Sequence, residues 1–227
     1  MTSENYSLFR SYIDQNQALE LEQYLLNQKI DCKLVDNSPT FDVTFANNPL
    51  DKNYQVLVNQ LDFSKATDLL EKDAETDLEK IDKDYYLFDF TDEELLEILM
   101  KPDEWGEFDF ILAQKLLKER GKNVNPEIIT LLKKQRIAEL SKPEENQTQW
   151  INSGYLMAFL GGIVGIMIGW YLMTYKKTLP NGEKIFAYSE KDRKHGRNIL
   201  IIGIIFLVIS FIANIYGEII STNFYLG

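Results

Sequence analysis

The sequence predicts an α+β soluble region joined to two membrane-spanning helices. Three observations predict this class. Strand and helix signals alternate over the first third of the 227-residue chain, helical segments with clear end signals follow, and two long apolar runs without charge come last. We expect three parts, at residues 1–75, 76–145 and 146–227. The net charge of −11 is unevenly divided, because residues 151–227 carry +3, which leaves −14 for residues 1–150.

The first part is expected to contain three strands and two helices. The strands are expected at residues 6–12, 30–36 and 54–59. The helices are expected at residues 14–28 and 62–73. Asp14 is a suitable N-cap for the first helix. The segment DYYLFDF at residues 84–90 is a candidate for a closing strand, so the order is βαββα(β), with helices on one face of an antiparallel sheet.

Three helices are expected between this α+β part and the apolar runs. Thr91 and Glu94 form a capping box before LLEILM, and Pro102 ends that helix. Gly121 closes the next helix, EFDFILAQKLLKER, and Asn125 caps the third. Their apolar stripes indicate a bundle that packs on itself or on the sheet, or else a docking groove for a helix of another protein.

Two apolar runs predict a two-helix transmembrane hairpin with spans at about 152–175 and 198–217. A bilayer core requires about 20 apolar residues, and both runs are long enough. Trp and Tyr residues lie near their ends, as is typical of the headgroup region. The opening MTSENYSLFRSYID has no basic or apolar region of the kind found in signal peptides. We expect an inner-membrane protein with two spans.

Small residues recur at helical spacing in both runs, and such stripes let helix backbones approach closely. The positions expected at helix contacts are Gly154, Ala158, Gly161, Gly165, Gly169, Gly203, Ser210 and Gly217. The two stripes can pack against each other within the hairpin, or the first can mediate homo-oligomerisation. Neither run contains Asp, Glu, Lys or Arg, so the sequence shows no apparatus for ion or charged-substrate transport.

The connecting loop, residues 176–197, is basic and is expected to begin with a β-hairpin that turns at Asn181-Gly182. The residues expected to contact lipid headgroups or a partner are Lys176, Lys177, Arg193, Lys194 and Arg197. The positive-inside rule places such a loop in the cytoplasm. With two spans, that placement requires export of the acidic amino-terminal region without a signal peptide. We therefore expect a cytoplasmic amino-terminal region, and the charge of the loop conflicts with it.

The sequence predicts no catalytic, cofactor or metal site, and we expect the protein not to be an enzyme. The single cysteine, Cys32, and the single histidine, His195, exclude a multi-cysteine zinc site, and no nucleotide-binding loop is present. Glu94, Glu97 and Asp109 carry the carboxyl groups that acid–base catalysis uses. Carboxylates at this density are, however, typical of solvated helix faces. The net charge of −14 before the first run disfavours nucleic acid as a partner.

Part of the chain resembles a known bacterial domain family. The resemblance rests on Ser11–Leu26, on QKIDCKLVDN and on YQVLVNQLDFSKATDLLEK. These segments resemble the prokaryotic signal-transducing protein domain family, which implies a ferredoxin-like fold reminiscent of the PII nitrogen regulators. The chain departs from the family pattern at Asn37–Asn53, and no catalytic or binding residue can be carried over. As a whole, the chain resembles uncharacterised two-span membrane proteins of Bacteroidota.

From these features we expect a non-enzymatic, membrane-anchored regulatory or interaction module. Its soluble amino-terminal region would bind a protein partner or a small ligand. The alternative is an accessory or assembly subunit of a larger inner-membrane complex, packed through the glycine stripe of the first span. The expected partners are membrane lipid and either another protein or a second copy of the chain, with no cofactor, metal or nucleic acid.

Overall fold

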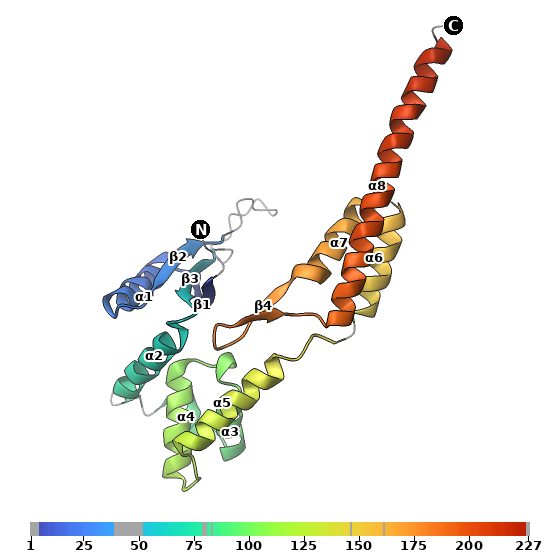
Figure 1. Ribbon diagram of the computed structural model, residues 1–227. Coiled ribbons are helices and arrows are strands. Elements are labelled where there is room, and N and C mark those ends of the chain that lie inside the picture. The colour runs from blue at the N-terminus through green and yellow to red at the C-terminus, as the bar shows by residue number, and fades with distance from the viewer. Residues whose placement is uncertain are drawn as a thin grey trace. The chain divides into compact units, whose positions relative to one another are not determined.

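The structure is a computed structural model that describes residues 5–38, 52–78, 81–82, 84–145, 147–160 and 162–225, with side chains to Tyr216. The chain divides into two compact units. Unit 1 comprises Met1–Ser141 and Thr178–Lys184, and unit 2 comprises Lys142–Lys177 and Ile185–Gly227. Figure 1 labels the α-helices of both units and the strands β1 to β4. The mixed α+β class agrees with the prediction.

Unit 1 contains an antiparallel sheet of three strands within its described residues. The strands are β1 (Tyr6–Tyr12), β2 (Cys32–Asp36) and β3 (Tyr54–Asn59), in the order β1-β3-β2. β1 and β3 have the predicted bounds, and β2 starts two residues later than predicted. The central strand pairs with both neighbours, and its Val56 and Val58 are fully buried. The segment around residues 39–51, where a departure from the family pattern is expected, lies outside the described residues.

Helix α1 (Gln15–Asn27) and the first half of α2 (Phe63–Asp77) bury their apolar side chains with the inner face of this sheet. The Asp14 side chain accepts a hydrogen bond of 2.9 Å from the Asn16 backbone N–H, which confirms the predicted N-cap. Leu25 of α1 is fully buried in this core, whereas the next residue, Leu26, is half exposed. Burial on one helical face is what positions α1 on the sheet.

Helix α2 belongs to two hydrophobic cores. Its Phe63 and Ala66 lie in the core of the sheet, whereas Ala74 near its end lies in a second core formed by the helices that follow. The expected boundary between residues 75 and 76 therefore falls inside a continuous helix. Because α2 is shared, the sheet and the helices belong to one compact unit.

The second core is built by α3 (Asp92–Met100), α4 (Glu107–Glu119) and α5 (Pro126–Leu140). The end signals of all three helices are confirmed. Thr91 and Glu94 form the capping box of α3, and the Asn125 side chain accepts a 2.9 Å hydrogen bond from the Ile128 N–H. Gly121, which follows α4, has a φ of +80°, a conformation that favours glycine.

The segment DYYLFDF does not form the closing strand expected at residues 84–90. It contains a short 3-10 helix, η4 (Tyr86–Asp89), whose Leu87 is fully buried in the second core. The Tyr85 hydroxyl donates a 2.6 Å hydrogen bond to Asp109 of α4, and its ring contacts Phe108. Packing in the second core buries Leu87 and partly buries Tyr85, whereas Tyr86 and Phe88 stay exposed.

Unit 2 corrects the expectation of two spans. The run expected as one span at about 152–175 forms two helices, α6 (Thr148–Leu160) and α7 (Ile163–Thr174), separated at Gly162, whose φ is +72°. The run expected at 198–217 lies inside one long helix, α8 (Glu190–Tyr225). Within the described residues, only Glu190–Tyr216 is long and apolar enough to cross a membrane. The left-handed conformation at Gly162 interrupts the first run, because a right-handed helix cannot continue through it.

Strands β4 (Lys176–Thr178) and β5 (Lys184–Phe186) pair in the loop between α7 and α8. Gly182 at their turn has a φ of +81°, which confirms the predicted hairpin. Residues 190–197 are expected in the loop but form the first two turns of α8 instead.

We predict that Leu25→Ala lowers the free energy of unfolding of the sheet by about 2–5 kcal/mol, because it leaves a cavity in a fully packed core. Hydrogen exchange of the β3 backbone amides in the detergent-solubilised full chain measures this loss. Leu26→Ala is the matched control, with an expected change within about 0.5 kcal/mol. Equal effects of the two changes would contradict the burial described for α1.

Candidate functional site

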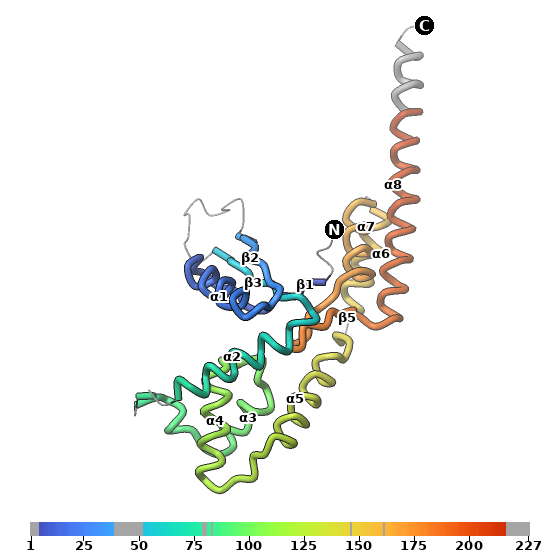
Figure 2. The backbone as a smooth tube through the Cα atoms, turned by 60° about the vertical axis from the view of Figure 1, so that its left-hand side comes forward, coloured from blue at the N-terminus to red at the C-terminus, as the bar shows by residue number. Residues whose placement is uncertain are grey.

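The helices of unit 2 pack at unusually short distances. A Cβ atom placed on Gly169 would lie 2.6 Å from the Gly196 carbonyl oxygen, and one on Gly162 would lie 2.8 Å from that of Gly203. Both distances are shorter than side-chain carbons tolerate, so glycine is required for α7 to approach α8. The order of these contacts shows that the two helices run antiparallel. Figure 2 shows α6 and α7 beside the first part of α8, with the rest of α8 extending beyond them.

Helix α6 packs against both other helices. A Cβ on Gly154 would lie 2.9 Å from Ile199 of α8 and 3.0 Å from Ile168 of α7. A Cβ on Gly165 would lie 2.5 Å from the backbone of Ala158. Among the predicted contact residues, Gly154, Ala158, Gly165, Gly169 and Gly203 thus meet neighbours in the same chain. Ser210 is exposed, Gly161 lies outside the described residues, and Gly217 lies in α8 beyond the described side chains.

The outward surface of these helices is apolar. Its large side chains, called the apolar shell below, are more than a third exposed. They are Leu156, Met157, Phe159, Leu160, Ile163, Val164, Met167, Trp170, Ile201, Ile204, Ile205, Val208, Ile209, Phe211, Ile212 and Ile215. Soluble proteins rarely expose apolar patches of this extent, which mark membrane or protein contacts.

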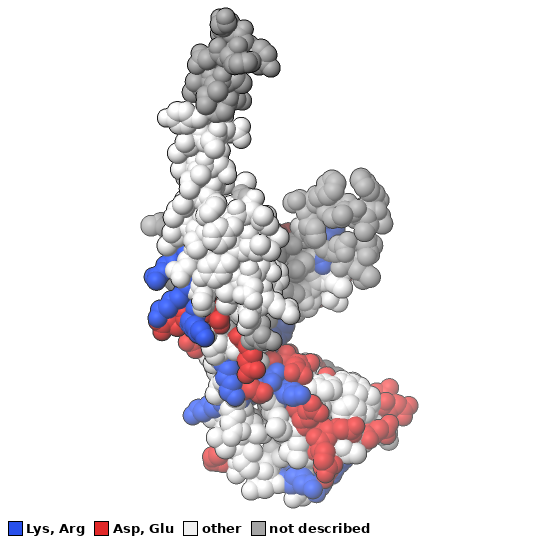
Figure 3. All heavy atoms as spheres, turned by 90° about the vertical axis from the view of Figure 1, so that its right-hand side faces the viewer, with Lys and Arg blue, Asp and Glu red and all other residues white. Residues whose placement is uncertain are grey.

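Basic side chains gather at one end of the apolar shell. This basic collar consists of Lys176, Lys177, Lys191, Arg193, Lys194 and Arg197. It contains all five residues predicted to contact headgroups or a partner, and Lys191 completes it. Figure 3 shows basic side chains together with acidic ones at one end of the helices, whereas the described surface farther along α8 shows neither. Arg193 and Lys176 also lie over the ring of Phe186, at 3.8 and 5.1 Å from its centroid.

Aromatic side chains lie at the same end as the collar. Tyr188 contacts the rings of Tyr171 and Tyr175, and burial raises the pKa of the Tyr188 hydroxyl. His195 of α8 lies beside Tyr155 of α6, with 3.1 Å between its Nδ1 and the tyrosine hydroxyl oxygen. The sequence placed His195 in the connecting loop, and nothing in it indicated that Tyr155 would lie beside this residue.

A second polar contact involves the tip of the β4–β5 hairpin, which belongs to unit 1. Ser7 of β1 is fully buried, and its hydroxyl donates a hydrogen bond of 2.5 Å to the Gly182 carbonyl oxygen. Gln60 donates to the same carbonyl at 3.2 Å, and the Lys184 ammonium donates to the Tyr6 carbonyl at 2.5 Å. A Cβ on Gly182 would lie 2.6 Å from the Phe63 ring. Sequence reasoning missed this contact, which joins residues about 175 positions apart.

The carboxylates considered for acid–base chemistry have structural partners. Glu94 accepts a hydrogen bond from the Thr91 backbone N–H in the capping box, and Glu97 pairs with Lys101 on the same helix. Asp109 accepts from Tyr85. Within the described residues, no group of three or more His, Cys, Asp or Glu side chains could hold a metal ion.

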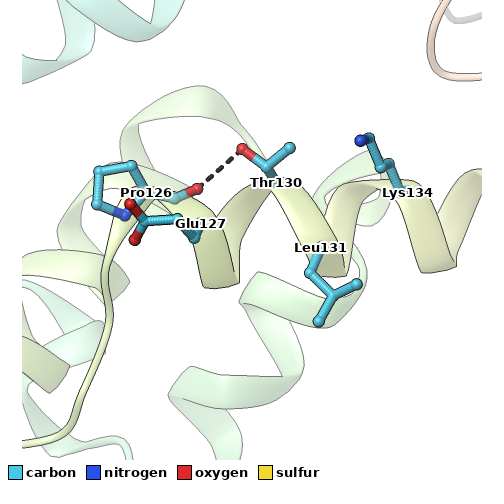
Figure 4. A pocket seen from close by; sticks show the side chains of 5 residues that line it. All are labelled: Pro126, Glu127, Thr130, Leu131 and Lys134. Atoms are coloured by element: carbon cyan, nitrogen blue, oxygen red, sulfur yellow. Dashed lines mark hydrogen bonds between the residues drawn. The ribbon is translucent and has the colours of Figure 1, made fainter.

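The outer face of α5 carries a shallow groove of about 400 Å³. It is lined by five residues of α5, which Figure 4 shows: Pro126, Glu127, Thr130, Leu131 and Lys134. The Thr130 hydroxyl donates a hydrogen bond to the Pro126 carbonyl of the same helix. The neighbouring Leu131 side chain is half exposed.

Comparison of the chain with protein-family models, with curated proteins and with solved structures finds no match. Its function is therefore inferred from the contacts, charges and exposed surfaces of the described residues. The apolar shell with its basic collar, and the α5 groove, are two outward surfaces in the described part of the chain.

We predict that Cys32 reacts slowly with thiol reagents. Burial raises its pKa to about 11, which at pH 8 leaves roughly 100-fold less thiolate than in an unfolded chain. Because the folded value is the higher one, the associated stability is complete below about pH 9 and is lost as pH rises toward 11. Iodoacetamide labelling of the full chain in detergent, with and without urea, measures the ratio. Equal rates would show that the thiol is accessible in the folded chain.

Proposed function

We propose that the protein is a membrane-anchored, non-enzymatic interaction module. The observation that carries this proposal is the apolar surface of α8, where the 27-residue stretch Glu190–Tyr216 has only 11% of its most apolar window buried. Such a helix is stable when lipid covers it, and it is joined to a folded unit that has its own cores. The acidic unit 1 is then held at the membrane surface.

The basic collar supports the membrane assignment. Lys and Arg next to an apolar helix are attracted to anionic headgroups by about 1 kcal/mol each. The aromatic rings of Trp150, Tyr171 and Tyr175 are exposed near the same end, where the interface between lipid and water favours them. We propose the inner membrane as the location and the cytoplasm as the site of unit 1.

The α5 groove is the surface that we propose for a protein partner. Helix α5 has no fully buried residue, and it is held in place by Arg136, whose guanidinium donates 2.7 and 2.9 Å hydrogen bonds to Asp103. A helix fixed in this way presents Leu131 outward without moving. An apolar side chain of a partner, flanked by charges that match Glu127 and Lys134, suits this groove.

A signal-transducing role for the sheet domain is part of the same proposal. The antiparallel order β1-β3-β2, with helices after the first and third strands, agrees with the first five elements of a ferredoxin-like fold. The alternative, an accessory subunit packed through the glycine stripe, has less support, because the described glycines of that stripe contact the chain's own helices.

We predict that a photo-reactive amino acid at Leu131 forms a discrete crosslinked product in intact cells, because the α5 groove is open to a partner. The same residue at Leu61, which is 93% exposed but lies outside the groove, is the matched control and should give none. Gel mobility after irradiation measures both. Carbonate washing of the membranes runs in parallel, and the full chain should stay in the pellet. Release by carbonate would contradict the anchor, and equal products from both positions would contradict the groove.

A further inference from the structure

We propose that α6 and α7 form a re-entrant hairpin, which enters one leaflet and returns to the same side, so that α8 alone crosses the membrane. The proposal rests on the membrane attachment proposed above. It adds how deeply α6 and α7 enter the membrane and on which side the chain leaves it. The apolar side chains of α6 and α7 would contact the acyl chains of a single leaflet. Residues before α6 and the loop after α7 would then share one side of the membrane.

The contacts of Gly154 show that the chain reverses within the first apolar run. A Cβ on Gly154 would lie 3.0 Å from Ile168. In a continuous helix, these residues, 14 positions apart, would be separated by about 21 Å along the axis. Gly165 likewise lies against Ala158. The two arms therefore run side by side.

The lengths of the arms match half of a bilayer. Helix α6 has 13 residues and α7 has 12, which correspond to about 20 and 18 Å at 1.5 Å per residue. Neither reaches the roughly 30 Å of the hydrocarbon core. Stacked end to end, the two helices would be long enough to cross the hydrocarbon core. The reversal of the chain between them makes that arrangement impossible.

Both ends of the hairpin lie together in unit 2. The Glu144 backbone N–H, before α6, donates a 2.8 Å hydrogen bond to the Ala187 carbonyl, before α8. The Ala187 N–H donates in turn to the Tyr175 carbonyl, after α7, at 3.1 Å. The Lys177 ammonium donates to the Lys142 carbonyl at 2.7 Å. The entry to α6 and the exit from α7 are thus joined directly and cannot lie on opposite sides of a membrane.

The backbone of Gly162, at the reversal, is covered by α8. Peptide groups outside helices are tolerated at membrane depth only where protein buries them. Gly162 is buried against Gly203 and Leu207, which lie midway along the apolar run of α8. Its N–H donates to the Met157 carbonyl at 3.3 Å, and its carbonyl accepts from Ile166 at 2.9 Å. The hairpin tip therefore has hydrogen-bond partners within the chain.

Unit 1 supplies an independent observation. Its sheet contacts the tip of the loop through Ser7 and Gly182, and Lys184 donates to the Tyr6 carbonyl. With two full spans, a bilayer would separate the loop from the sheet, and these hydrogen bonds could not form. With a re-entrant hairpin, the loop and the sheet are on the same side.

The charges around α8 then agree with a cytoplasmic amino-terminal region. The basic collar precedes the apolar run of α8, whereas residues 198–227 contain a single charged residue, Glu218. The positive-inside rule places the collar in the cytoplasm, together with unit 1. The conflict between the basic loop and a cytoplasmic amino-terminal region arises only if the first run crosses the membrane.

Cysteine labelling distinguishes the two topologies. Three variants each add one cysteine to the natural chain, at the exposed residues Ser11 and Thr178 and at Ser221. The natural Cys32 is buried, so the chain without an added cysteine is the unlabelled control. Spheroplasts are treated with a membrane-impermeant maleimide before and after permeabilisation. We expect Ser11→Cys and Thr178→Cys to react only after permeabilisation, and Ser221→Cys to react in intact spheroplasts.

Each other pattern would overturn the proposal. Two full spans place Thr178→Cys opposite the other two positions, and a helix α8 that fails to cross places all three on one side. The proposed membrane anchor would survive the first of these patterns, since it depends on carbonate resistance rather than on sidedness. A failure of the anchor and a failure of the topology are therefore separable.

A substitution at the crossing of α6 and α7 gives a second test. In the re-entrant hairpin, Gly165→Ala places a methyl group against the Ala158 backbone, so we expect the thermal midpoint of unit 2 to fall by about 5 °C or more. In a continuous helix the same change replaces glycine by the best helix former and would leave the midpoint unchanged or raise it, which would contradict the hairpin. Fluorescence of Trp150 and Trp170 in detergent reports the midpoint. Ser153→Ala, at an exposed position of α6, is the control that should show no loss.

Discussion

The close approach of three helix backbones is the constraint on which unit 2 depends. At Gly162, Gly165 and Gly169, even a methyl group would collide with backbone atoms of a neighbouring helix. These positions allow α6 and α7 to lie directly on the first part of α8, and this packing buries the reversal at Gly162. Without it, the peptide groups of the reversal would face hydrocarbon, where unsatisfied backbone groups cost several kcal/mol each. The same glycines therefore allow the fold and make it compatible with lipid.

Unit 1 is joined to unit 2 by more than one chain connection. The chain passes between the units after Ser141 and again on each side of the loop tip Thr178–Lys184. The loop tip is held by the buried Ser7 hydroxyl, which donates to the Gly182 carbonyl, and by Gln60, which donates to the same carbonyl. Since α2 contributes to both cores of unit 1, the sheet that holds the loop and the helix bundle that carries the α5 groove are packed as one body. A partner bound at α5 would thus act on the unit that also holds the loop.

Local signals predicted most of unit 1 from the sequence. β1, β3 and the caps Asp14, Thr91 and Asn125 follow from alternation and from side chains that bond to the nearest backbone groups, and the hairpin at Gly182 follows from its turn residues. The reversal in the first apolar run could not be predicted in this way, because hydropathy reports the length of an apolar run and not its direction. Small residues at helical spacing are equally consistent with one long helix. The signal that was available is the positive charge of the following loop, which disagrees with a spanning first run.

The outward surface of unit 2 bears on where the proposed partner would bind. A specific helix partner in a membrane needs small residues that allow close contact, and here the described glycines of α6 and α7 are already covered by the chain itself. The side chains left outside, such as Leu156, Met167 and Ile205, are large and exposed, and acyl chains would cover them in the proposed membrane setting. The proposed anchor then needs no further helix. In this proposal specific recognition falls to unit 1, where Arg136 bonds α5 to Asp103 and Leu131 is half exposed.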